Sequence, residues 1–105
     1  MIKEFAVQKI EELMKIERAL EQGIVSPNKE LTAGYLSDGG YWEQWIVIKG
    51  KNRPEVMANA EYFIADYEWL NNETLLYVTM MGQFFSVDAK TGRQKGSVKK
   101  FVLFP

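Results

Sequence analysis

The sequence contains no cysteine and no histidine. Without cysteine, the chain has no disulfide, no thiol nucleophile and no thiolate metal ligand. Without histidine, it lacks the usual general base and the commonest metal ligand of proteins. Nucleophilic pairs of serine or cysteine with histidine are therefore excluded. We accordingly expect a protein that is not an enzyme and that binds no metal and no cofactor.

Paired carboxylates are the catalytic arrangement that these absences leave open. Several acidic residues lie in or beside predicted turns, where acidic residues are common without any catalytic role. No spacing among them selects two, so we expect no catalytic residue. The candidates for such a pair are Glu43, Asp66, Glu68, Glu73 and Asp88.

Long apolar runs are missing as well. No run approaches the roughly 18 residues that a membrane-spanning helix needs. The N-terminal sequence MIKEFAVQKIEELMK is charged throughout, unlike a signal peptide. We therefore expect a cytoplasmic protein without membrane contact, although a chain that lacks cysteine would also suit an exported bacterial protein.

Length and composition indicate one globular domain over residues 1–105. Hydrophobic residues make up 47% of the chain and charged residues 26%, which are ordinary values for a folded protein with one core. The net charge of −1 is unevenly distributed. Residues 1–88 carry eight basic and fourteen acidic side chains, whereas residues 89–105 carry five basic and none acidic. The C-terminal part is thus a basic hairpin on an acidic body, which could steer an acidic partner or simply be a solvated edge.

The clearest element is an amphipathic helix over residues 2–22. Its polar side includes Glu11 and Lys15, a favourable pair four residues apart. Gly23 is expected to end the helix in a left-handed conformation. Such a helix needs a cover, which we expect to be a sheet, and Val7 and Met14 widen the stripe enough for part of it to meet a partner. The residues of the stripe, at spacings of three and four, are Ile2, Phe5, Ala6, Ile10, Leu13, Ile16 and Leu20.

Strand patterns fill most of the remaining chain. Residues 41–49 carry apolar or aromatic side chains on both faces, which predicts a central strand covered on both sides. A shorter strand is expected over 31–36. Further strands are expected at 74–79, 84–87 and 98–104, separated by turns at 71–72, 80–83 and 88–92, which together predict a meander.

Residues 54–64 fit two structures. Asn52, Pro54 and Glu55 resemble a helix start, and the apolar residues that follow share one face at helical spacing. A strand reading fails to alternate cleanly, because Phe63 and Ile64 are adjacent. We therefore favour a short second helix here. The fold class is predicted to be α+β, with an N-terminal amphipathic helix packed on an antiparallel meander sheet of four to six strands and a second short helix near 54–64.

The function that fits best is a small non-enzymatic protein-binding module of inhibitor, immunity or adaptor type. Three Trp, five Tyr and five Met exceed what one small core readily hides, and such residues are frequent interface anchors. We expect a protein partner to bind the loops near 37–42 and 88–95 together with exposed aromatic rings, and homo-oligomers are compatible with this surface. The predicted partner-binding residues are Asp38, Tyr41, Trp42, Trp69, Lys90, Arg93 and Lys95.

Two alternatives remain open. Single-stranded nucleic acid could bind sheet aromatics beside the basic C-terminal hairpin, although the acidic body and a pI of about 5.5 disfavour it. A small ligand could instead occupy a pocket between helix and sheet.

Overall fold

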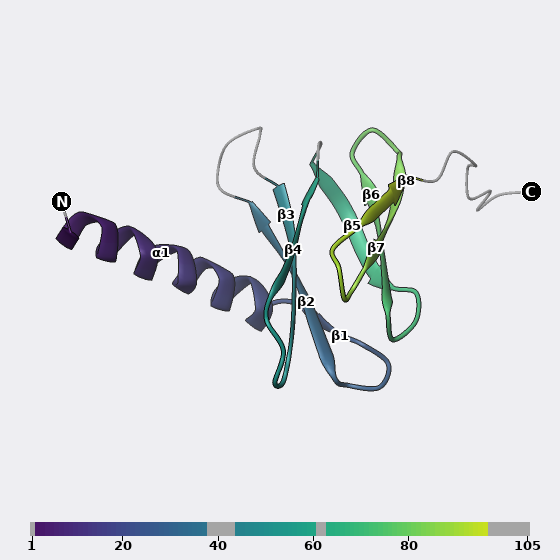
Figure 1. Ribbon diagram of the computed structural model, residues 1–105. Helices are drawn as coiled ribbons and strands as arrows, with labels where there is room; N and C mark the ends of the chain where they lie inside the picture. The colour runs from purple at the N-terminus through teal and green to yellow at the C-terminus, as the bar shows by residue number, and fades with distance from the viewer. Residues whose placement is uncertain (1, 38–43, 61–62, 97–105) are drawn as a thin grey trace, which may run out of the picture.

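A computed structural model describes residues 2–37, 44–60 and 63–96, with helix side chains from position 10 onward except 12. Within these residues the chain forms one helix and two antiparallel sheets of four strands each (Figure 1). The predicted α+β class and the packing of the helix on a sheet are confirmed. The strands are divided between two sheets, where the sequence predicted a single sheet of four to six.

The first sheet follows the helix directly and has the order β1-β2-β3-β4. Its neighbouring strands are consecutive in the chain and pair antiparallel. The helix covers one face of this sheet, and the second sheet covers the other face (Figure 1). The elements are α1 Ile2–Glu21, β1 Ile24–Val25, β2 Leu31–Ser37, β3 Gln44–Gly50 and β4 Val56–Ala60.

The second sheet is a meander with the order β5-β6-β7-β8, as the sequence predicted for this part of the chain. The expected turns at 71–72, 80–83 and 88–92 all separate paired strands. The strand expected at 98–104 lies outside the described residues. The strands are β5 Ile64–Trp69, β6 Thr74–Thr79, β7 Phe84–Asp88 and β8 Gln94–Gly96.

The core lies between the two sheets and takes one face from each. Side chains alternate along β6, where Leu75, Tyr77 and Thr79 are buried and their neighbours are partly exposed. Tyr77 stacks on Phe85 of β7 with 5.1 Å between ring centroids. The fully buried aliphatic residues of this core are Ala33, Ile46, Leu75, Val87 and Ala89.

The second helix predicted near 54–64 is wrong. Residues 56–60 form β4, which pairs with β3 in the register Ile46↔Ala58. Ala58 and Ala60 face the core while Met57 and Asn59 point outward, so the segment alternates as a strand. Pairing with β3 forms backbone hydrogen bonds that the local sequence does not reveal. These bonds favour a strand over the helix that the spacing of the apolar residues predicts.

A β-bulge explains why β5 did not look like a strand in the sequence. The register shifts between Ile64 and Asp66, so Ala65 is an extra residue on this strand. The shift changes the face on which the following residues lie. Ile64 and Trp69 are both buried, although five positions separate them, and Asp66 and Glu68 point to solvent.

Helix α1 packs on the outer face of the first sheet through its C-terminal half. Ile16 and Ala19 are buried there, and Val47 of β3 is fully buried on the same face. Since Ile46 and Ile48 point into the core, β3 is covered on both sides, as predicted. Gly34 of β2 permits the close approach, because a Cβ atom at this position would lie 2.3 Å from the carbonyl oxygen of Ala19.

Gly23 does not cap the helix in the way that the sequence predicted. Among the described glycines, only Gly82 and Gly92 have a positive φ, so the expected left-handed cap is wrong. A Cβ atom on Gly23 would lie 2.0 Å from the carbonyl oxygen of Ala33. The glycine therefore allows the chain to pass from the helix into β1 against the backbone of β2.

Candidate functional site

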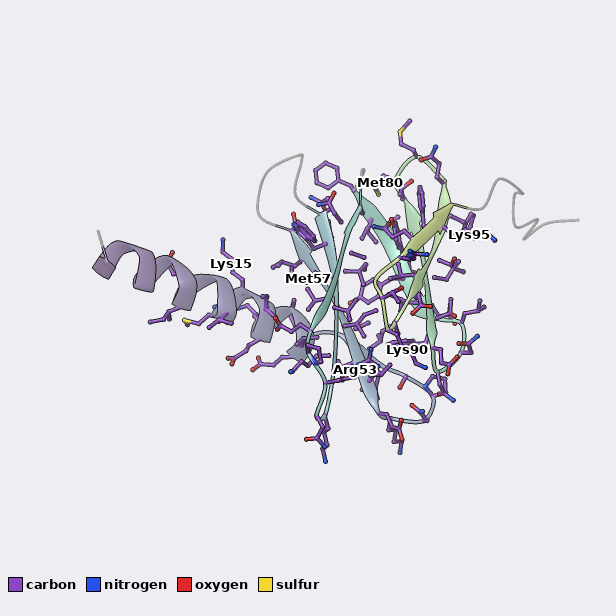
Figure 2. All side chains as sticks on the ribbon, viewed as in Figure 1. Lys15, Arg53, Met57, Met80, Lys90 and Lys95 are labelled. Atoms are coloured by element: carbon purple, nitrogen blue, oxygen red, sulfur yellow. The ribbon has the colours of Figure 1, made fainter. Side chains whose placement is uncertain are left out.

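Four turns meet at one end of the two sheets and enclose a groove. They are the β1–β2, β3–β4, β5–β6 and β7–β8 turns, two from each sheet. The groove has a volume of about 670 Å³. Its apolar surface includes Leu31 and Ala89, both of which are buried at the edge of the core. Figure 2 shows Arg53 and Lys90 at this end of the molecule.

Hydrogen bonds between turns hold the groove together. The amide N–H of Asn28 donates to Oδ1 of Asn72 at 2.8 Å, which joins the β1–β2 turn to the β5–β6 turn. Nη2 of Arg53 donates to the carbonyl oxygen of Ala89 at 2.6 Å, which joins the β3–β4 turn to the β7–β8 turn. The amide of Ala89 donates in turn to the carbonyl oxygen of Glu73 at 2.9 Å. The four turns therefore keep a defined relative position.

The β7–β8 turn is shaped by Asp88, as its position in the sequence predicted. Its Oδ1 accepts the amide N–H groups of Lys90 at 2.7 Å and of Thr91 at 3.1 Å. These bonds hold the pKa of the Asp88 carboxyl below its ordinary value of 3.8. Gly92, with φ of 75°, completes the turn. Since the Asp88 carboxylate accepts hydrogen bonds from backbone amides, it stabilises the turn that borders the groove.

The Asn71-Asn72 turn also forms, but its asparagines act through their side chains. The described residues with positive φ other than glycine are Lys29 and Asn52, so neither residue of this pair adopts the left-handed conformation. Oδ1 of Asn71 accepts the amide N–H of Glu73 at 2.8 Å, while Oδ1 of Asn72 reaches the β1–β2 turn. The pair thus both closes a hairpin and connects the sheets.

Charged side chains of both signs line the groove. The β3–β4 and β7–β8 turns contribute Lys51, Arg53 and Lys90 and no carboxylate to its lining. The β1–β2 and β5–β6 turns contribute Glu30 and Glu73 together with the amides of two asparagines and one further cation, Lys29. The lining carries a net charge of +2 on a chain whose net charge is −1.

A second hollow of about 680 Å³ lies beside the groove, between the C-terminal end of α1 and the turns of the first sheet. It shares Lys29, Glu30 and Lys51 with the groove, so these three side chains separate the two spaces. The sequence-based alternative of a ligand between helix and sheet corresponds to this hollow, which is shallow and open to solvent.

The helix presents a separate surface. Its N-terminal half extends beyond the sheets (Figure 1). Ile10, Leu13 and Met14 are 56%, 49% and 53% exposed, whereas Ile16, in the half that packs on the sheet, is 9% exposed. The apolar stripe predicted for the helix therefore continues past the point where the sheet covers it.

The structure separates the residues that the sequence suggested for partner binding. Asp38, Tyr41 and Trp42 lie outside the described residues. The expected exposure of Trp69 is wrong, because the ring is 8% exposed and its Nε1 donates to the carbonyl oxygen of Ile24 at 3.0 Å. The bulge at Ala65 turns this ring inward.

The three predicted basic residues are exposed, but they do not form one site. Lys90 lines the groove, whereas Arg93 and Lys95 are absent from its lining. Lys51 and Arg53 also line the groove, and both lie in the turn between β3 and β4. Nothing local indicates that this turn meets Lys90, because the contact between Arg53 and Ala89 spans 36 positions.

Neither a metal centre nor a membrane-spanning helix is found in the described ranges. In residues 2–37, 44–60 and 63–96, no three acidic side chains gather closely enough to hold a metal ion. The helix in these ranges is too polar to cross a membrane. Comparisons of the chain with protein-family models, with curated proteins and with solved structures gave no match.

Proposed function

We propose that this chain is a cytoplasmic, non-enzymatic protein-binding module of inhibitor, immunity or adaptor type, and that it docks through helix α1. The observation that carries the proposal is the exposed apolar stripe of Ile10, Leu13 and Met14 in the middle of the helix. Exposed aliphatic side chains that adjoin one another on a protruding element mark interaction sites in water-exposed proteins.

The spacing of the stripe suits one mode of recognition. Positions 10, 13 and 14 are separated by three and four residues, so their side chains lie on one face of the helix. Amphipathic helices that enter a hydrophobic groove of another protein use anchors at this spacing. We therefore propose that the occupant of the stripe is a protein with such a groove.

A partner with a groove fits the stripe better than a second copy of this chain. Each side of a stable interface contributes roughly 800 Å² of surface. Three half-exposed aliphatic side chains on a single helix supply much less when two such helices pair face to face. A groove covers a helix on several sides and also reaches its polar flanks, which include Glu11 and Lys15.

The charged flanks are consistent with a helix that is exposed before binding. Glu11, Lys15, Glu17 and Arg18 are all exposed, and they carry both signs. Such residues keep the helix hydrated and form the polar rim that surrounds the apolar centre of an interface. Because the two signs largely cancel, the affinity of the proposed interface should depend little on the net charge of the partner.

Nucleic-acid binding receives less support from the geometry. Stacking on bases needs exposed aromatic faces. Tyr77, one of the rings on which this alternative relies, is 2% exposed and stacks on Phe85 inside the protein. Arg93 and Lys95 are exposed, but the ring that pairs beside them, Phe85, is only partly exposed and stacks on Tyr77.

The test compares the full chain with two helix variants, Leu13→Glu and Met14→Glu. A partner is first isolated from lysate on the wild-type protein and purified, and its affinity for each variant is then measured by titration calorimetry. We expect both substitutions to weaken binding at least about tenfold, because each places a charge in an apolar groove. Met80→Glu is the matched control, since Met80 is 70% exposed and lies at the far end of the sheets from Arg53 (Figure 2).

Two outcomes would contradict the proposal. Equal affinities of the wild-type and helix variants would place the interface elsewhere on the molecule. A wild-type chain that is dimeric by light scattering, and monomeric after Leu13→Glu, would show that the stripe is covered by a second copy and not by a different protein.

A further inference from the structure

A hydrogen bond holds the Arg53 guanidinium in place in the groove between the four turns. Its Nη2 atom donates to the carbonyl oxygen of Ala89 at 2.6 Å, and the side chain is only partly exposed. A guanidinium has five N–H donors in a rigid planar fork, so one bond fixes its orientation and leaves other donors available. An anion that binds there does not have to immobilise a free arginine side chain, which reduces the entropic cost of binding.

The hydrogen bond from Arg53 to Ala89 also joins two turns that carry two further cations. Lys51 precedes Arg53 by two residues in the β3–β4 turn, and Lys90 follows Ala89 directly in the β7–β8 turn. All three line the groove, and Figure 2 shows Arg53 and Lys90 side by side at this end. Three like charges in one groove repel one another, and an anion between them reduces this repulsion.

The carboxylates near these cations leave the groove with a positive balance. Asp88, the nearest to Lys90 in sequence, directs Oδ1 to the amides of Lys90 and Thr91. Glu30 and Glu73 belong to the lining, but the four cations of the lining outnumber them and give it a net charge of +2.

The lining also contains hydrogen-bond acceptors. Glu30 and Glu73 carry carboxylates, and Asn28 and Asn72 carry amides. Acceptors of this kind suit hydroxyl or amine groups of a ligand. The groove volume of about 670 Å³ falls within the range of roughly 300–1,000 Å³ that is usual for small-molecule sites.

We propose that this groove binds a small organic anion, with its phosphate or carboxylate group between Lys51, Arg53 and Lys90 and its hydroxyl or amine groups toward Glu30 and Glu73. This site is independent of the helix surface proposed for protein docking. It lies at the turn end of the sheets, and none of its lining residues belongs to α1.

Binding can be measured on the full chain by nuclear magnetic resonance, with the backbone amides of 51–53 and 89–90 as reporters. Four probes distinguish the ligand chemistry: inorganic phosphate, ribose 5-phosphate, gluconate and unmodified ribose. We expect ribose 5-phosphate or gluconate to shift these amides in a saturable manner, and to bind more tightly than inorganic phosphate, because only the organic anions also carry hydroxyl groups for the carboxylates and amides of the lining. Ribose alone should cause no shift, and whichever organic anion binds more tightly identifies the charged group.

The variants separate the role of the cations from the stability of the turns. Arg53→Gln should weaken the tighter organic anion by about tenfold or more, since a charge-assisted hydrogen bond is lost. The double variant Lys51→Gln/Lys90→Gln retains the bond between Arg53 and Ala89 and should still weaken binding about fivefold or more. Lys95→Gln removes an exposed charge outside the groove and should leave the affinity unchanged.

Three results would overturn the proposal. The first is no saturable shift of the groove amides with any anion at millimolar concentration. The second is an equal loss of affinity in Lys95→Gln and in the double variant, which would indicate attraction by overall charge. The third is binding of a short single-stranded oligonucleotide that shifts the amide resonances of β8 and leaves those of the groove unchanged.

Discussion

The indole N–H of Trp69 donates to the carbonyl oxygen of Ile24 at 3.0 Å, and this bond joins the edge strands β5 and β1 of the two sheets. Strand β1 has only two residues and pairs with β2 alone within its own sheet. The bond from Trp69 therefore gives it a second attachment. The residue expected to bind a partner instead closes one side of the core.

Trp69→Phe should destabilise the fold. Phenylalanine retains an apolar ring but leaves the carbonyl of Ile24 without this donor and leaves part of the indole volume empty. We expect a loss of about 1–3 kcal/mol in the free energy of unfolding. Urea titration followed by far-ultraviolet circular dichroism measures it without relying on tryptophan emission.

Leu70→Ala is the control for this substitution. Leu70 follows Trp69 directly and is 59% exposed, so its truncation should change stability by less than about 0.5 kcal/mol. Similar effects of the two substitutions would show that Trp69 does not anchor the core.

Gly34→Ala should disturb the contact between helix and sheet. The added methyl group would lie 2.3 Å from the carbonyl oxygen and 2.6 Å from the carbonyl carbon of Ala19. Both are backbone atoms, so no side-chain rotation relieves the clash, and we expect a cost of about 1–3 kcal/mol or more. Hydrogen exchange should accelerate in the last turns of α1, where the helix moves away from β2.

Gly96→Ala provides the matched comparison. A Cβ atom there meets only ring atoms of Phe85, the nearest at 3.3 Å, and this side chain can shift. Its stability and the exchange of α1 should remain close to wild type. A Gly34→Ala protein with unchanged helix exchange would contradict the described packing of α1 on β2.

Buried and exposed apolar side chains of helix α1 should respond differently to truncation. Ile16→Ala removes a side chain that is 9% exposed and should cost about 2 kcal/mol. Leu13→Ala removes one that is 49% exposed and should change stability by less than about 0.5 kcal/mol. Chemical denaturation of both variants measures the difference, and equal costs would mean that the sheet covers the whole helix.

Asp88 should make the fold sensitive to acid. The amides of Lys90 and Thr91 lower the pKa of its carboxyl in the folded state. A carboxyl with a lowered folded pKa contributes stability above its unfolded value of about 3.8, and this contribution is lost as pH falls through the folded pKa. Stability should therefore decline as the pH drops below about 4.

Asp88→Asn tests this origin of the acid sensitivity. The asparagine side chain keeps an oxygen that accepts the same amide N–H groups, but it does not titrate in this range. Unfolding free energies measured between about pH 6 and pH 2.5 should decline less steeply for the variant than for the wild-type protein. Identical slopes would assign the acid sensitivity to other carboxyl groups.

Several elements could be predicted because their determinants lie close together in the sequence. The helix over 2–21 follows from a stripe at intervals of three and four, and the turn at 88–92 from an aspartate that accepts the amides two and three residues later. The two-sided apolar pattern of β3 likewise predicted its cover on both faces. In each case the residues involved lie within one short segment.

The missed features depend on residues that are distant in the chain. The segment 54–60 has helical spacing, but β3 supplies an edge to which it can pair. The bulge at Ala65 reverses the side-chain pattern of β5 and carries Trp69 into the core. The bulge is set by the pairing of β5 with β6 and by the packing of the two sheets, which no window of the sequence contains.

The sequence by itself determined the local elements and excluded chemistry that needs histidine or cysteine. Only the tertiary structure decided that two sheets enclose the core, that Ile10, Leu13 and Met14 of the helix are left uncovered, and that Arg53 and Lys90 share a groove. The physical reason is the range of the interactions. Caps, turns and amphipathic stripes arise between near neighbours, whereas strand pairing, burial and the clustering of charge depend on which distant segments meet.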